Sequence, residues 1–589
     1  MKRIIVVLTL IVLVLMSIGL LLSQQNQEDT KFKKILDSYL DETWKFFPTS
    51  ATQAGYHKYD NKLEDLSGKN IENRHEALDK FNQEFVTKVD SSKLSPENQI
   101  DHEIMMDALE LELLDHESLI PWEYNPVFYN DIIINSVRSL LTNNSAPLNQ
   151  RIKNATERLE ELPKLIKQAN ENLKTPPQIF TEIAINQFPG ILNFYRTELP
   201  NLLGQAPPNL KSKAQSAAAK VIPALEGYQN FLKNSLLPKS TGNFRLGGQT
   251  HARFLRLTLK NSIPLEELIA RARADYSNIR REMFLVAISF YKIMFPHVNI
   301  EQLGTRLTQE QVRNTVIEGV LDKIKGEHVA EDEFINKIKT TADEIKNFIL
   351  KDQLIELPQE SLNIEPMPIE KKGTTLTSLI IPGAYETSSS YTCQVASVPE
   401  DWEKEKIDSL LEEYNNFLIY FWTIRDVYPG QFVSSYYTKK FPSLLRNLLP
   451  NKPLIKGWPV YIEEMLIESG FGNYDLRLRL NQLKLYLRAV VDFLIEFNIH
   501  EGSMTKEQAI DYMVRGGFQS QTEAERKWAN VCLNPGDSVY TYVGIQEILD
   551  IEKEYAKLKG NSFSQKEFLQ KLLSYGALPI RHLKSKIIQ

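Results

Sequence analysis

The chain has 589 residues, of which 42% are hydrophobic and 24% charged, and a formal net charge of -6 at pH 7. This composition is typical of a globular protein with one or two large cores and excludes a mostly disordered chain. Basic residues are interspersed with acidic ones, so no basic face forms, and the composition argues against binding to nucleic acid.

The N-terminal segment, residues 4–22, is almost wholly apolar and follows Lys2 and Arg3. This pattern predicts an export segment that places the rest of the chain outside the cytoplasm, in the periplasm or at the cell surface. Its 19 residues exceed the usual signal-peptide core of about 7 to 15 and approach the roughly 20 that span a bilayer. We interpret residues 1–23 as an uncleaved membrane anchor, with a cleaved signal peptide as the alternative. No cysteine precedes Cys393, which excludes a lipoprotein acylation site.

Helical periodicity dominates residues 24–589, in which we find no internal repeat and no linker rich in Gly or Ser. The best seam between two lobes, 24–245 and 246–589, is the Gly-rich stretch 242–248. From Pro264, apolar residues recur every three or four positions as far as Met283, which predicts a long amphipathic helix. The same spacing between Asp475 and His500 predicts a second long helix, because strands seldom exceed about ten residues.

Residues 354–399 are the exception to this helical pattern. Five prolines in this stretch exclude long helices, and Thr374 to Ile381 is rich in β-prone residues. The sequence therefore predicts a mainly α protein with a small β element near residues 360–398.

The chain has two cysteines, Cys393 and Cys532. In an oxidising compartment they could form one disulfide, and the alternative is that both are small buried side chains. Two cysteines are too few for a thiolate metal site.

Two segments of the second half carry the most specific pattern. The first contains Arg425-Asp426-x-x-Pro-Gly-Gln431-Phe432-x-Ser434, and the second, residues 456–463, reads Lys-Gly-Trp-Pro-Val-Tyr-Ile-Glu. They resemble blocks of the bacterial domain of unknown function 885 family, His-Glu-x-x-Pro-Gly-His-His/Tyr-x-Gln and Glu-Gly-Trp-Ala-x-Tyr-x-Glu. The resemblance extends from about residue 30 to the end and implies a large, multi-helix, metallopeptidase-like fold with a central cleft. It also implies that Arg425 to Ser434 form the helix of a former active site, turned at Pro429-Gly430, with a strand of the β element beside it.

The reactive positions of the family are substituted in this chain. Arg425 and Gln431 stand where the family has its two histidines, Asp426 replaces the glutamate, and Lys456 replaces a carboxylate of the second block. The substituted positions are Arg425, Asp426, Gln431, Phe432, Ser434, Lys456 and Thr541. The resemblance therefore implies that no catalytic residue of the family is retained.

A hydrolytic zinc site needs three protein ligands and an open position for water. No two of the nine histidines lie within two helical turns of each other, and none of the four His-Glu pairs completes His-Glu-x-x-His. Zinc is expected in the family, but neither zinc nor another cofactor is expected here.

Two cations, Arg425 and Lys456, stand where the family places metal-site residues. We hypothesise that they pair with Asp426 or Glu463, hold the cleft together without metal, and receive an anionic group such as a peptide carboxylate. The alternative is that both are exposed side chains on altered helices. The residues expected to line the cleft, with ordinary packing as the alternative, are Glu463, Arg488, His500, Tyr540 and Tyr542.

The sequence thus predicts an extracytoplasmic pseudo-peptidase that binds or scaffolds peptides or other anionic ligands without catalysis. Two alternatives stay open: a divergent hydrolase with a non-standard metal set or no metal, and a structural protein of the cell envelope. Neither a Gly-x-Ser-x-Gly elbow nor a phosphate-binding loop is present to suggest another catalytic class.

Overall fold

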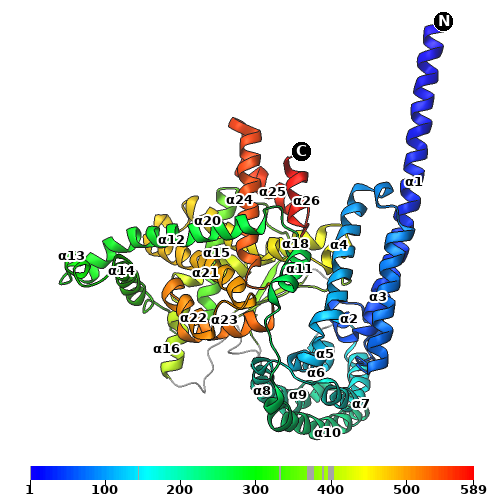
Figure 1. Cartoon of the computed structure of the whole chain (residues 1–589), viewed down its shortest axis with the longest axis horizontal. Coiled ribbons are helices and arrows are strands. Elements are labelled where there is room, and N and C mark those ends of the chain that lie inside the picture. Colours follow the sequence, from blue (N-terminus) through cyan, green and yellow to red (C-terminus); the bar gives the residue numbers. More distant parts are fainter. Residues whose placement is uncertain are drawn as a thin grey trace. The chain divides into compact units, whose positions relative to one another are not determined.

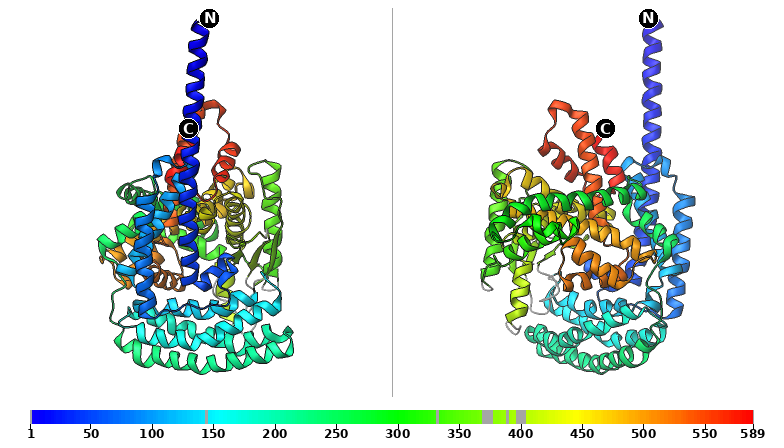
Figure 2. Two further views of the ribbon diagram at one scale, coloured as in Figure 1. Left: turned by 90° about the vertical axis from the view of Figure 1, so that its right-hand side faces the viewer. Right: turned by 60° about the vertical axis from the view of Figure 1, so that its left-hand side comes forward.

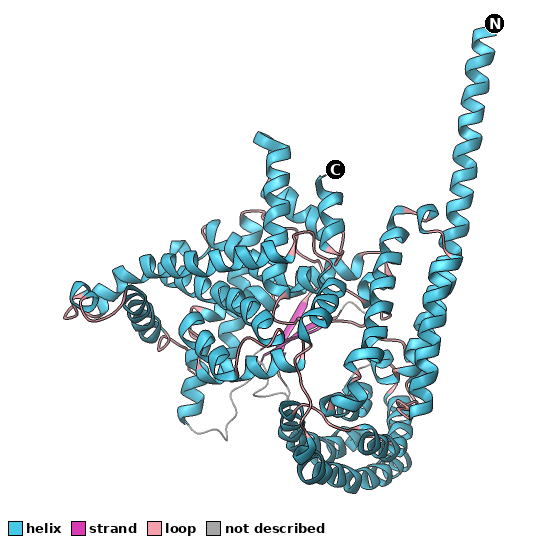
Figure 3. Ribbon diagram, in the orientation of Figure 1, coloured by secondary structure: helices cyan, strands magenta, loops and turns pink. Residues whose placement is uncertain are grey.

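A computed structural model gives the structure of residues 2–142, 145–330, 333–367, 377–387, 390–395 and 404–588, with the side chains of residues 2–22 outside the description. It is built of helices and one small three-stranded sheet (Figure 3). The prediction of a mainly α fold with a small β element is confirmed. The chain forms two compact units, Met1–Asn243 and Phe244–Gln589.

The described residues of the first unit form helices joined by loops, with no β-strand among them (Figure 1). Several of its helices have a proline in their first turn, where the missing N–H group is not needed. The helices α7 and α10 lie side by side (Figure 2). Its α-helices are α1 (Lys2–Phe46), α2 (Pro48–Ala54), α3 (Gly68–Lys88), α4 (Pro96–Leu114), α5 (Pro121–Tyr124), α6 (Pro126–Thr142), α7 (Leu148–Asn172), α8 (Gln178–Asn193), α9 (Leu199–Leu202) and α10 (Pro208–Phe231).

The predicted anchor belongs to α1, which continues without a break from Lys2 into the folded part of the unit. Within the described residues, no helix combines the length and the apolarity needed to cross a membrane.

A buried arginine ties three elements of the first unit together. Arg158 of α7 is fully buried and donates hydrogen bonds to the carbonyl oxygens of Pro48, Lys62 and Ser136 and to the hydroxyl of Thr52. Burial lowers the pKa of Arg158 to about 10, so the guanidinium stays charged at neutral pH. These bonds satisfy the donors of the buried guanidinium, which would otherwise lack partners.

The second unit holds the sheet and the remaining helices. The helices predicted from Pro264 and from Asp475 are confirmed as α12 and α21, and the Asp475 side chain caps α21 by accepting from the Arg477 N–H. The α-helices of this unit are α11 (Gly247–Leu259), α12 (Leu265–Met294), α13 (Ile300–Gly304), α14 (Gln309–Ile324), α15 (Phe334–Lys351), α16 (Lys404–Glu413), α17 (Leu418–Asp426), α18 (Gln431–Lys440), α19 (Leu444–Leu448), α20 (Lys452–Glu468), α21 (Leu476–His500), α22 (Lys506–Asp511), α23 (Gln521–Leu533), α24 (Tyr540–Lys559), α25 (Gln565–Ser574) and α26 (Ile580–Ile588).

The sheet has the order β1-β3-β2, with β1 (Leu362–Pro366) parallel and β2 (Thr377–Ile380) antiparallel to the central β3 (Tyr391–Val395). Of the predicted strand Thr374–Ile381, residues 374–376 lie outside the described residues and Thr377–Ile380 form β2. Cys393 is buried in β3, and both it and the buried Cys532 are free thiols, so they do not form the disulfide that the sequence left open.

The helices α20 and α24 cross with their backbones in contact. A Cβ atom at Gly457 would meet the backbone of Gly544, and one at Gly544 would overlap the carbonyl oxygen of Pro453. Glycine at both positions therefore permits a close crossing, which brings Lys456 of α20 and Thr541 of α24 to the same pocket.

Candidate functional site

The segment that resembles the family's zinc helix is two helices with a turn between them. α17 ends at Asp426 and α18 begins at Gln431, and the peptide bond between Tyr428 and Pro429 is cis. The Gly430 N–H donates to the Ile424 carbonyl oxygen at 2.9 Å, and a Cβ atom at Gly430 would overlap the carbonyl oxygens at the end of α17. The predicted turn at Pro429-Gly430 is confirmed, but the prediction of one helix from Arg425 to Ser434 is wrong.

The turn is also held by α20. The indole N–H of the buried Trp458 donates to the Pro429 carbonyl oxygen at 2.9 Å. Trp458 thus fixes the end of α17 relative to α20, and Arg425 and Lys456 on these two helices reach the same pocket.

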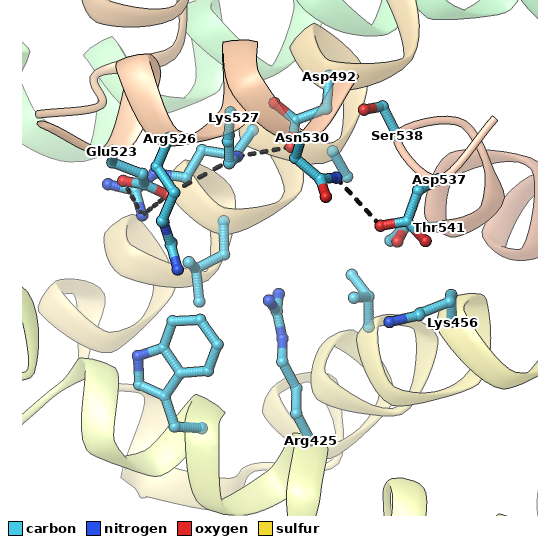
Figure 4. A pocket seen from close by; sticks show the side chains of 15 residues that line it. Arg425, Lys456, Asp492, Glu523, Arg526, Lys527, Asn530, Asp537, Ser538 and Thr541 are labelled. Carbon is cyan, nitrogen blue, oxygen red and sulfur yellow. Dashed lines mark hydrogen bonds and ion pairs between the residues drawn. The ribbon is translucent and has the colours of Figure 1, made fainter. Parts of the chain in front are cut away.

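The pocket has a volume of about 260 Å³ and is lined by residues from α17, α20, α21, α23 and the start of α24 (Figure 4). Its charged lining residues are Arg425, Lys456, Arg488, Arg526 and Lys527 with Asp492, Glu523 and Asp537. Four other side chains supply apolar contact: Trp422, Val460, Leu485 and Ala489. The remaining lining residues are polar: Asn530, Ser538 and Thr541.

A paired guanidinium forms part of the pocket wall. Arg425 donates from Nε and Nη2 to the two carboxylate oxygens of Glu463, with 3.1 Å between Nη2 and Oε2. The Glu463 side chain has no exposed surface, whereas that of Arg425 is 18% exposed. Burial raises the pKa of Glu463 to about 7, although Arg425 pulls it down. Of the hypothesised pairs of Arg425 and Lys456 with Asp426 or Glu463, the structure has the Arg425–Glu463 pair, whereas Lys456 forms no ion pair with a described residue.

Asp426 lies behind the same wall. It accepts a hydrogen bond from the hydroxyl of Thr377, so β2 lies beside the end of α17. Burial raises the pKa of Asp426, while Arg425 and Lys456 lower it. The charge of the nearby Asp426 also raises the pKa of Glu463, since two close carboxylates cannot both ionise at little cost.

The wall formed by α21 and α23 carries an ion-pair network. Arg488 lies 3.1 Å from a carboxylate oxygen of Glu523, and Lys527 lies 2.6 Å from one of Asp492. Burial alone would raise the pKa of Glu523, but Arg488 and Lys527 bring it down to about 2. The four charges of this network therefore largely neutralise one another.

Two cations are left outside these pairs. Lys456 and Arg526 are exposed and line the pocket, and neither has an ion pair with any residue that the structure describes. On the same pocket, Asp537 accepts a hydrogen bond from the Asn530 amide at 3.2 Å. The pocket thus offers free cationic donors beside one carboxylate that is bonded to a neutral group.

The other predicted residues lie elsewhere. Gln431, Phe432 and Ser434 are on α18 and do not line this pocket; Phe432 is fully buried against Tyr391. Ser434 borders a separate small crevice.

Of the residues expected to line the cleft, Arg488 lines the pocket and Glu463 lies behind Arg425. The buried side chains of His500, Tyr540 and Tyr542 do not reach it. The imidazole Nε2 of His500 is 3.1 Å from the Val531 carbonyl oxygen, and the Tyr542 hydroxyl donates to Asp275 at 2.8 Å.

Sequence reasoning missed the contribution of α23. Glu523, Arg526, Lys527 and Asn530 line the pocket together, because positions three, four and seven apart share one face of a helix. That spacing was visible in the sequence, but only the position of α23 against α21 makes it part of a site.

The residues around the pocket do not fit a zinc ion. A dication about 4 Å from each of Arg425 and Lys456 would be repelled by about 8 kcal/mol per cation at an effective dielectric constant of about 20. The Glu463 carboxylate is already bound by Arg425, and those of Glu523 and Asp492 are paired with Arg488 and Lys527. Among the described residues, no three His, Cys, Asp or Glu side chains are grouped so that they could hold a metal ion.

The comparisons with known proteins agree on a fold and leave the activity open. A family model described as "Bacterial protein of unknown function (DUF885)" matches residues 48–587. A solved structure described as a putative lipoprotein of unknown function from Shewanella oneidensis is 24% identical, with a TM-score of 0.81, and the match covers 95% of this chain and 100% of that one. A putative lipoprotein from Colwellia psychrerythraea is 13% identical, with a TM-score of 0.75, covering 96% of this chain and 98% of that one. No curated protein matches the sequence.

Proposed function

The chain belongs to the DUF885 family of bacterial proteins, and from this premise we propose that it is a catalytically inactive, metallopeptidase-like protein that binds an anionic ligand outside the cytoplasm. The observation that carries the proposal is the pocket in the second unit, where five cationic side chains meet three carboxylates. Peptides are the ligands that the family resemblance suggests, through a carboxylate group.

The state of the carboxylates supports binding over catalysis. A general base must be within hydrogen-bond reach of the proton that it removes. Glu463 has no exposed surface and both its oxygens accept from Arg425, while Glu523 and Asp492 are held by Arg488 and Lys527. Because cations already hold their oxygens, these carboxylates are poorly placed to take a proton from a substrate.

The proposed location rests on the N-terminal segment and on the similar structures. Residues 4–22 are apolar and follow two basic residues, and the two similar structures are described as putative lipoproteins. Residues 1–392 contain no cysteine that could carry a lipid. We propose that residues 4–22 themselves anchor the protein in the membrane.

Calorimetric titration of the full chain in detergent with acetate, inorganic phosphate and short peptides tests the binding proposal. At least one anion is expected to bind the wild type, and Lys456→Glu should abolish that binding. Lys557→Glu is the matched control, because Lys557 is an exposed lysine of α24 outside the pocket. Unchanged melting and unchanged binding in Lys456→Glu would refute the role of the pocket.

Metal analysis separates this proposal from the alternative of a divergent hydrolase. We expect the purified protein to retain no stoichiometric zinc after dialysis, because the pocket cations repel a dication. Zinc at one equivalent together with peptide hydrolysis would overturn the non-catalytic assignment.

A further inference from the structure

We propose that the ligand of the cationic pocket is a small monoanionic carboxylate that carries an apolar group, as the C-terminal residue of a peptide does. This inference rests on the proposed function and names the chemical class of its ligand. Three features of the pocket carry it: its charge, the positions of its free donors, and its apolar lining.

The charge of the pocket fits one negative group. Five cations line it against the carboxylates of Asp492, Glu523 and Asp537, which leaves two positive charges. Behind the wall, Glu463 binds Arg425 and offsets one of these charges, while burial opposes the ionisation of Asp426. About one positive charge then remains, which a carboxylate balances and a phosphate dianion exceeds.

The free donors converge from three helices. Glu463 occupies Nε and Nη2 of Arg425, so Nη1 has no hydrogen-bond partner among the described residues. In Figure 4, Arg425 extends into the pocket from α17, Arg526 points in from α23, and Lys456 points in from α20. A carboxylate has two oxygens that can accept from such donors together, and these charge-assisted bonds are stronger than neutral ones.

The remaining lining accepts an apolar group of limited size. Trp422, Val460, Leu485 and Ala489 contribute carbon surface beside the cations. The volume of about 260 Å³ is below the ~300–1,000 Å³ typical of drug-sized ligands. The pocket is therefore suited to about one amino-acid residue, with its carboxylate at the cations and its side chain at the apolar wall.

Titration calorimetry at pH 7 on the full chain tests the ligand class with N-acetyl-leucine, N-acetyl-glycine and N-acetyl-leucinamide. N-acetyl-leucine should bind about tenfold or more tightly than N-acetyl-glycine, because its branched side chain leaves water. N-acetyl-leucinamide, which lacks the carboxylate, should show no binding. Free leucine carries an ammonium group and is net neutral at pH 7, so it should bind more weakly than N-acetyl-leucine. Equal or tighter binding of free leucine would overturn the monoanionic class.

Variants at exposed positions link this binding to the pocket. Arg526→Gln and Lys456→Gln should each weaken N-acetyl-leucine binding by about tenfold, since each removes a charged hydrogen-bond donor. Neither side chain has an ion pair among the described residues, so both variants should fold. Lys557→Gln, an exposed lysine outside the pocket, should bind as the wild type does.

The outcomes separate this inference from the proposed function. If phosphate binds and Lys456→Gln abolishes its binding, while N-acetyl-leucine does not bind, the ligand class is wrong and the anion pocket stands. Equal binding of N-acetyl-leucine and N-acetyl-leucinamide would also overturn the class, because the carboxylate would then contribute nothing. If no anion binds the wild type, the proposed function itself is wrong.

Discussion

Arg425 both contributes charge to the pocket and links α17 to α20 through Glu463. The Glu463 carboxylate has no exposed surface, so its ionised form depends on this partner. A buried ion pair adds little stability compared with well-packed apolar residues, but removing one partner leaves an uncompensated charge. The pair therefore gives the pocket a fixed geometry, and its disruption has a large energetic effect.

We predict that Arg425→Met lowers the free energy of unfolding by about 3–5 kcal/mol, because it leaves Glu463 buried without its partner. The double variant Arg425→Met with Glu463→Leu should recover most of that loss. Urea unfolding followed by circular dichroism measures both. A single variant as stable as the wild type would show that Glu463 is protonated and needs no partner.

The raised pKa of Glu463 predicts how stability depends on pH. The carboxyl titrates near 7 in the folded chain and at a lower pH when unfolded, so between these values the folded state binds more protons. The stability that it contributes is fully present below the unfolded pKa and is lost as the pH rises through about 7. We expect the unfolding free energy of the wild type, relative to Glu463→Gln, to fall between pH 5 and 8. A relative stability that rises over this range would show that Glu463 is an ionised partner throughout.

At the scale of elements, the pocket depends on close approaches of backbone. Gly430 lets the chain turn back onto the end of α17, and Gly457 and Gly544 let α20 and α24 touch. These contacts position Arg425, Lys456 and Thr541, which come from three different helices. A side chain at any of the three glycines would have to move backbone, not just another side chain.

Gly544→Ala should lower the free energy of unfolding by about 1–3 kcal/mol or more, because its Cβ atom would overlap the Pro453 carbonyl oxygen. The control is Gly227→Ala in α10, where a Cβ atom meets nothing within 4 Å. That change should be neutral or stabilise by about 0.5–1 kcal/mol, since alanine favours the helix. Equal effects of the two substitutions in thermal unfolding would contradict the close crossing.

Elements with strong local signals could be predicted from the sequence. The apolar residues that recur every three or four positions predicted the helices α12 and α21. The prolines and β-prone residues between 354 and 399 predicted the sheet. The break between α17 and α18 could not be located, because it depends on the contact of Gly430 with α17 and on the hydrogen bond from Trp458. Likewise, the sequence alone does not distinguish Arg526 and Lys527 from charged residues on a solvent-exposed helix face. Their role in the pocket follows from the packing of α23 against α21.

At the scale of the whole molecule, each unit has its own group of buried or half-buried charged side chains. The pocket belongs wholly to the second unit, residues 244–589. The first unit has its own buried polar centre at Arg158, which joins α2, α6 and α7. A single arginine inside a helical core gives no signal in the sequence, since it is indistinguishable from a surface residue there.

We therefore predict that a substitution in the core of the first unit lowers the stability of that unit and leaves anion binding in the second unit unchanged. Arg158→Met should destabilise the first unit by about 3 kcal/mol or more, because it removes a buried charged group that donates four hydrogen bonds. Hydrogen exchange should then quicken in α2, α6 and α7, while anion binding in the second unit is unchanged at a temperature where the chain stays folded. Lys153→Met, an exposed position of the same helix, is the control and should alter neither. Loss of anion binding in Arg158→Met with unchanged exchange in α7 would contradict both the role of Arg158 and the assignment of the ligand site to the second unit alone.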